Sequence, residues 1–199
     1  MNILFDALPA SVKIGADEHK INTDFRCMAK FEQSLLTSDR GDKRHTALII
    51  VNTLKEFYVD GIPSDLTEAI NQMWWFYRCG ETIDSRSNSA WTSNNHTRLY
   101  DYEIDGALIV AAFADTYGID IINQKLHWWL FRSYFSNLGT ETRFVKVMGY
   151  RGMDTKQFKG KQRATYEKIK EYYRLPVVHQ TPMTLEERDE AYKRRLFGR

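Results

Sequence analysis

The chain has 199 residues, 43% of them hydrophobic and 14% aromatic, with a formal net charge of +2 at pH 7. This length and composition suit a globular chain whose core needs no covalent or metal staples, and the near-zero charge by itself selects no class of partner. The sequence has no apolar run of about 18 residues and no signal-peptide pattern of a basic region followed by an apolar stretch. We therefore expect a cytoplasmic chain without a membrane span. The two cysteines, Cys27 and Cys79, are far apart and outside any metal-binding spacing, which favours reduced buried thiols over a disulfide.

A β-hairpin and a helix are predicted first along the chain. Val12 and Ile14 alternate with polar neighbours before a Gly-Ala-Asp turn, the pattern of a short hairpin. Apolar residues at helical spacing then predict a helix over about 24–36, with Asn22 or Thr23 as its N-cap.

Two further helices are predicted before residue 80. The stretch 46–58 has the composition of the first of them. Asp65 with Glu68 three residues later is a capping-box pattern that opens a helix over about 66–79, and Gly80 stands where a glycine ends a helix.

The stretch 81–98 is rich in Ser, Asn and Thr, shows no hydrophobic period and predicts a flexible loop or linker. We expect it to separate an N-terminal part, 1–80, from a helical second half, 99–175. The helical patterns of that second half occupy 100–118, 123–139, 140–150 and 159–176.

The C-terminal part of the chain is basic. Residues 151–199 contain 13 Lys and Arg against 7 Asp and Glu, whereas residues 1–150 contain 15 against 19. A capping box at Thr184 and Glu187 predicts a further helix in the extension 176–199. Basic residues interleaved with tyrosines occur in nucleic-acid-binding helices, but here we expect the tyrosines to pack the helix onto the body and the charges to face solvent. The predicted fold class is therefore mainly α, a multi-helix bundle with a short N-terminal β-hairpin.

The pattern Trp-Trp-x-x-Arg occurs twice, in "INQMWWFYRCG" and in "LHWWLFRSYF". Adjacent residues of a helix point about 100° apart, so the two tryptophans of a pair cannot both lie in one narrow stripe. Such helices are apolar on most sides and must be buried or carry a partner surface. In both motifs an arginine lies four residues after a tryptophan, where its guanidinium can stack on the indole. The candidates for core or protein-interaction roles are Trp74, Trp75, Arg78, Trp128, Trp129 and Arg132.

No residue pattern of a catalytic, cofactor or metal site is found. The five histidines are scattered, and no HxxxH, HExxH, CxxC, GxxxxGK[ST], GxGxxG or GxSxG motif occurs. The acidic run at Asp101, Glu103 and Asp105 is better suited to capping a helix than to binding a metal. The sequence thus predicts a protein that is not an enzyme and has no cofactor.

Several stretches together resemble the bacteriophage gene-product-fifteen family of Gram-positive phages and prophages. They cover roughly residues 4–175 and read "LPASVKIGADEHKINTDFR", "INQMWWFYRCG", "RLYDYEIDGALIVAAFADTYGIDI", "LHWWLFRSYFSNL" and "FVKVMGYRGMD". The chain differs from the family pattern in a polar loop over 81–98 and in the extension after Pro176.

The resemblance implies a tail-gene product from the position where long-tailed phages encode tail assembly chaperones. Such a chaperone keeps the helical tape-measure protein soluble, recruits subunits of the major tail (tube) protein, and is left out of the finished virion. The expected partners are therefore the tape-measure protein, the tube protein and further copies of the chain, in the host cytoplasm. Two alternatives stay open: a structural tail or connector component, and a nucleic-acid-binding regulator that uses the basic C-terminal helices.

Overall fold

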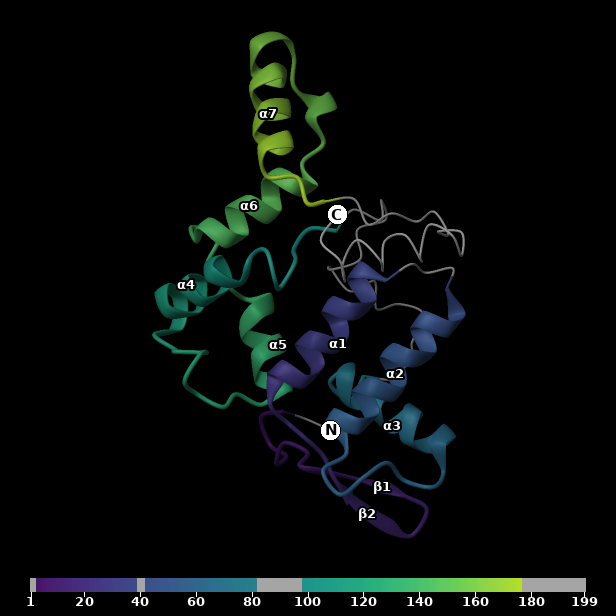
Figure 1. Cartoon of the computed structure of the whole chain (residues 1–199). Helices are drawn as coiled ribbons and strands as arrows, with labels where there is room; N and C mark the ends of the chain where they lie inside the picture. Colours follow the sequence, from purple (N-terminus) through teal and green to yellow (C-terminus); the bar gives the residue numbers. More distant parts are fainter. Residues whose placement is uncertain (1–2, 39–41, 82–97, 177–199) are drawn as a thin grey trace, which may run out of the picture.

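A computed structural model describes residues 3–38, 42–81 and 98–176 (Figure 1). Within these ranges the chain forms a two-stranded antiparallel hairpin followed by helices, which confirms the predicted mainly α fold with an N-terminal hairpin. The elements are β1 Ser11–Ile14, β2 Asp17–Lys20, α1 Phe25–Thr37, α2 Lys43–Phe57, α3 Leu66–Tyr77, α4 Gly106–Tyr117, α5 Trp128–Ser136, α6 Arg143–Gly152, the 3-10 turn η1 Thr155–Gln157 and α7 Gly160–Tyr172. The predicted linker and the predicted C-terminal helix fall almost entirely on 82–97 and 177–199, outside the described residues.

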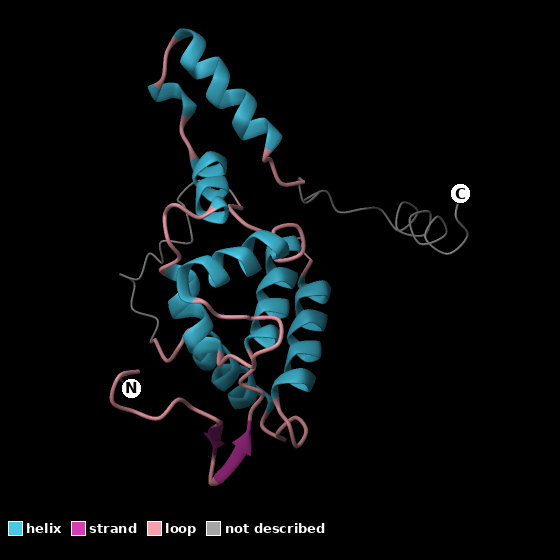
Figure 2. Cartoon of the chain, turned by 90° about the vertical axis from the view of Figure 1, so that its left-hand side faces the viewer, coloured by secondary structure: helices cyan, strands magenta, loops and turns pink. Residues whose placement is uncertain are grey.

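The hairpin forms as its pattern predicts. Gly15 adopts a left-handed conformation with φ 61° in the turn, and Ile14 pairs with Asp17 across it. Val12 and Ile14 are buried, whereas most of β2 is exposed. The hairpin therefore covers one end of the helices with the apolar face of β1 (Figure 2).

The N-cap of α1 differs from the prediction. Helix α1 is capped by Asp24, whose carboxylate accepts the backbone N–H of Arg26, and not by Asn22 or Thr23. The Asn22 side chain instead accepts the N–H of Asp24. Each side chain accepts the N–H group two residues further along the chain, so Asn22 shapes the approach to the helix and Asp24 caps it.

The helices of the second half are shorter than the sequence patterns. Helix α4 begins at Gly106, because the Asp101 carboxylate accepts the N–H groups of Glu103 and Ile104 and closes a separate turn before the helix. Helix α5 begins at Trp128, because His127 before it is extended and its ring nitrogen accepts the N–H of Trp129 as an N-cap.

Gly118 ends α4 as expected, whereas the first left-handed residue after the C-cap of α3 is Cys79, with φ 57°, one residue before the predicted Gly80. Gly80 follows α3 with φ 78° and Gly118 ends α4 with φ 67°. At the start of α3 the Asp65 carboxylate accepts the N–H of Glu68, which is half of the predicted capping box. The other half is absent from the described contacts of Glu68, whose carboxylate accepts from Gln72 instead.

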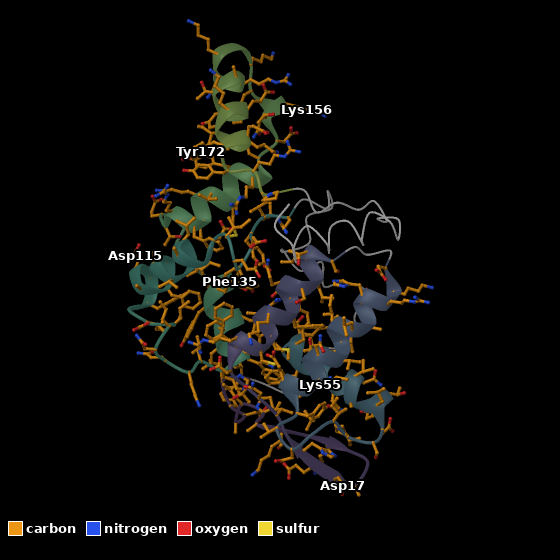
Figure 3. All side chains as sticks on the ribbon, in the orientation of Figure 1. Asp17, Lys55, Asp115, Phe135, Lys156 and Tyr172 are labelled. Atoms are coloured by element: carbon orange, nitrogen blue, oxygen red, sulfur yellow. The ribbon has the colours of Figure 1, made fainter. Side chains whose placement is uncertain are left out.

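One continuous hydrophobic core joins the hairpin, α1, α2 and α3 with α4, α5 and α6. Helix α1 packs against α2 on one side and α5 on the other, and α4 packs against α6 (Figure 1). Phe135, labelled in Figure 3, is 3% exposed inside this core. No helix in the described ranges is both long and apolar enough to span a membrane.

Helix α7 and η1 form an arm that projects from α6, at the opposite end of the molecule from the hairpin (Figures 1 and 2). None of the residues of α7 is buried. Tyr166 packs on Phe158 with ring centroids 4.4 Å apart, and Tyr173 stacks on Tyr150 at 5.9 Å, as predicted for tyrosines that hold the helix down. For Tyr172 the prediction is wrong: its side chain is 79% exposed (Figure 3).

Candidate functional site: the paired tryptophans and the outer surface of α2

The second tryptophan pair is fastened to the end of the helix that carries the first pair. The indole N–H of Trp128 donates to the carbonyl of Tyr77 at 2.9 Å, and that of Trp129 donates to the carbonyl of Phe76 at 2.8 Å. The carbonyl of Phe76 also accepts the backbone N–H of Cys79 at 3.0 Å, so the indole of Trp129 adds a second bond there, and the indole of Trp128 supplies a donor to the carbonyl of Tyr77. Trp128 is fully buried and Trp129 is 3% exposed, which places both in the core.

Gly80 makes this fastening sterically possible. Its φ of 78° lies in the left-handed region, and a Cβ built on it would lie 2.9 Å from Cη2 of Trp129. A side chain at this position would therefore collide with the indole that covers the end of α3.

The first tryptophan pair is half-buried and rests on the core. The ring of Trp74 packs edge-on against Phe31 at 5.1 Å, and the ring of Trp75 packs edge-on against Trp129 at 5.5 Å. Each keeps part of its surface accessible to solvent. The structure thus brings the two motifs together, with the second pair inside and the first pair on top of it.

The two arginines lie in different surroundings. The guanidinium of Arg132 lies 5.5 Å from the ring centroid of Trp128, as the spacing predicts, and 5.8 Å from that of Tyr77. No matching contact between Arg78 and Trp74 occurs in the described part of the chain. The Nε of Arg78 is buried and has no hydrogen-bond partner among the described residues.

Arg132 belongs to a buried polar network centred on Glu32, which is 7% exposed. The Glu32 carboxylate accepts the hydroxyls of Tyr100 at 2.7 Å and Tyr102 at 3.0 Å, and its Oε1 is 3.5 Å from Nη1 of Arg132. Burial, followed by the nearby negative charge of Glu32, raises the pKa of both tyrosines well above the usual value. Both therefore stay neutral hydrogen-bond donors that tie the loop after residue 98 to α1.

A second buried ion pair joins α4 to α6 at the base of the arm. Arg151 and Asp105, 6% and 2% exposed, form two hydrogen bonds, of which the one between Nη2 and Oδ1 is 2.9 Å long. Arg151 also donates to the carbonyls of Leu99 at 3.0 Å and Tyr173 at 2.7 Å. Sequence reasoning missed this pair, because Asp105 was grouped with a capping run and nothing local links it to Arg151, 46 residues away.

The titratable groups near the tryptophans serve the fold. Burial raises the pKa of the Cys27 and Cys79 thiols to about 12, so neither is a thiolate nucleophile at neutral pH. His127 caps α5: its Nδ1 accepts the N–H of Trp129, and its Nε2 donates to the carbonyl of Pro9. Within the described ranges no group of three His, Cys, Asp or Glu residues could hold a metal ion.

Exposed apolar side chains gather on α2 and the segment that leads into α3. They are Leu48, Val51, Val59, Ile62 and Leu66, with exposed fractions from 37% to 61%. A sequence signal for this surface exists: the apolar run "ALIIV" is too continuous for one side of a helix, so part of it must face outward. Exposed apolar side chains mark a protein-binding surface when they form a contiguous patch.

The fold and this site define a mainly helical protein whose most distinctive side chains support packing. The sequence model of the Bacteriophage Gp15 protein family matches residues 4–175, which is most of the chain. The chain therefore belongs to this family, a family of phage structural or assembly proteins. Searches of curated proteins and of solved structures find no match to the chain.

Proposed function

We propose that the chain is a non-enzymatic tail assembly chaperone. It binds the tape-measure protein in the host cytoplasm, recruits tail-tube subunits to it, and leaves before the virion is complete. Family membership supports the general class, a phage structural or assembly protein.

The observation that carries the proposal is the exposed apolar surface of α2 and the following segment. Leu48 is 56% exposed and Val59 is 61% exposed, although the core beneath them is well packed. A helical protein with long apolar faces can be kept soluble when such a surface covers them. Trp128 and Trp129 are in the core, so they support binding only by stabilising the fold. Trp74 and Trp75 retain exposed surface that a partner could cover.

The test is capture of the tape-measure protein encoded beside the chain's own gene. The tagged chain and the tape-measure protein are co-expressed, and the soluble complex is measured for the wild type and for Leu48→Ser/Val51→Ser. The matched control is Ile104→Ser/Ile122→Ser, which removes two side chains that are 54% and 62% exposed elsewhere on the surface. We expect the first variant to lose the complex and the control to keep it. A wild-type chain that captures no tape-measure protein would contradict the proposal.

The family class also supports a second candidate, a structural component of the tail or connector. Quantitative mass spectrometry of purified virions separates the two. A chaperone is absent from virions or far below one copy per tail ring, whereas a structural component is present at a fixed stoichiometry.

The basic arm favours a third candidate, a nucleic-acid-binding regulator. Residues 154–174 carry seven Lys and Arg against three Asp and Glu, and no residue of α7 is buried. Two of these cations form local ion pairs, Arg163 with Glu167 inside α7 and Arg174, just after α7, with Glu171. Binding to duplex DNA that weakens steeply with salt would support this candidate, and no binding at low salt would exclude it.

A further inference from the structure

Four side chains form one stripe along the outer face of α2. Arg44, Leu48, Val51 and Lys55 follow one another at steps of four, three and four residues, so they lie within about 60° of each other around the helix and span about 16 Å. All four are exposed. The opposite face of α2 is committed to the core through Ile49, Thr53, Leu54 and Phe57.

The stripe has an apolar centre and a cation at each end. Neither Arg44 nor Lys55 forms an ion pair with any described residue. The nearby carboxylates have other partners: Glu56 pairs with Lys30 at 3.2 Å, and Asp42 accepts the N–H groups that open α2. The charges of the stripe are therefore available to a partner, with Lys55 on the surface of α2 (Figure 3).

We propose that this stripe docks an amphipathic helix of another protein that presents two apolar residues about one turn apart between two carboxylates. The inference rests on the proposed function and deepens it, because it states what the tape-measure segment must look like. Leu48 and Val51 cover the apolar pair, and Arg44 and Lys55 meet the carboxylates at the two ends.

Charge complementarity also argues against a second copy of the chain as the occupant. In an antiparallel pairing of two stripes, Arg44 of one copy faces Lys55 of the other, and in a parallel pairing like residues face each other. Either direction places cation against cation, and the stripe itself contains no carboxylate to offset the repulsion. The stripe thus selects a different helix with acidic flanks.

The test uses two labelled helical peptides that differ only in their flanking charges. In one, Glu, Leu, Leu and Glu occupy positions at steps of four, three and four, with Ala and Gln elsewhere. In the other, Lys replaces both Glu. We expect fluorescence anisotropy at low salt to show binding about tenfold tighter for the Glu peptide. This factor corresponds to two exposed ion pairs that each contribute near the upper end of the usual range. The preference should shrink at high salt because exposed charges are screened.

The decisive variant is Arg44→Glu/Lys55→Glu, which should reverse the preference in favour of the Lys peptide. Its control, Lys125→Glu/Arg143→Glu, exchanges two exposed cations elsewhere and should leave the preference unchanged. Circular dichroism confirms that each variant is folded. An unreversed preference in the folded variant would overturn the inference, as would a dimer of the wild type that Leu48→Ser/Val51→Ser dissociates.

Failure of the inference can be told apart from failure of the proposed function. If the tape-measure protein is captured equally by the wild type and by the charge-reversed variant, the docking stripe is wrong and the chaperone function stands. If the wild type captures no tape-measure protein, the proposed function fails. The peptide preference alone then decides whether the stripe docks a helix with acidic flanks.

Discussion

Replacing Arg132 by methionine should destabilise the chain by about 3 kcal/mol without removing a partner contact. Removing one member of a buried ion pair typically costs about 3–5 kcal/mol, because the other charge is left uncompensated. The value here falls at the lower end, since Arg132 is 24% exposed, its distance to Glu32 is 3.5 Å, and two tyrosine hydroxyls still hold the carboxylate. Loss of the guanidinium from the face of Trp128 adds about 0.5–2 kcal/mol, which methionine offsets in part by packing.

The assay is urea unfolding followed by tryptophan fluorescence, with thermal unfolding as a second readout. For a chain of this size, 3 kcal/mol corresponds to a melting temperature lower by about 6–12 °C. Adding Glu32→Gln should recover part of the loss, because it removes the unpaired buried charge. The exposed control Arg143→Met should change stability by less than about 0.5 kcal/mol. An Arg132→Met variant as stable as this control would refute the reasoning, and so would loss of tape-measure binding in a fully folded variant.

Three further changes probe the packing around the tryptophans and the arm. Gly80→Ala should lower stability by about 2–4 kcal/mol in urea unfolding, from the left-handed backbone and the collision with Trp129; an effect below 0.5 kcal/mol would contradict that geometry. Burial lowers the pKa of His127 despite its bond to a backbone carbonyl, so the unfolded chain takes up the proton first as pH falls below about 6.5. Stability should therefore decline from pH 7 to pH 5, and His127→Asn, which can cap without titrating, should flatten the decline; an equal slope in both would refute this. Arg151→Met should cost about 3–5 kcal/mol by stranding Asp105, and hydrogen exchange should show α7 opening more readily than in the wild type; unchanged exchange would show that the arm does not depend on Arg151.

Local patterns predicted the local structure well. The hairpin follows from the alternation of Val12 and Ile14 beside a glycine turn, and the end of α4 follows from Gly118, because each depends on backbone chemistry within a few residues. The Trp-Arg spacing likewise predicted the stacking of Arg132 on Trp128.

Contacts across the chain could not be predicted in the same way. The bonds from the indoles of Trp128 and Trp129 to the end of α3 join residues 51 and 53 positions apart, and Glu32 and Arg132 are 100 apart. Helix starts were misplaced where several Asn and Asp residues compete to cap, as at Asn22 and Asp24. The exposed surface of α2 was not predicted, although the apolar run over residues 47–51 is longer than one helical face and indicates it.

The central claim is that the chain covers apolar helical surface of another protein through the outer face of α2. Its most direct test is the fraction of tape-measure protein that stays in solution when it is expressed alone, with the wild-type chain, and with Leu48→Ser/Val51→Ser. We predict a high soluble fraction only with the wild type and with the control Ile104→Ser/Ile122→Ser. A tape-measure protein that is equally soluble with the α2 variant, or without the chain at all, would contradict the account.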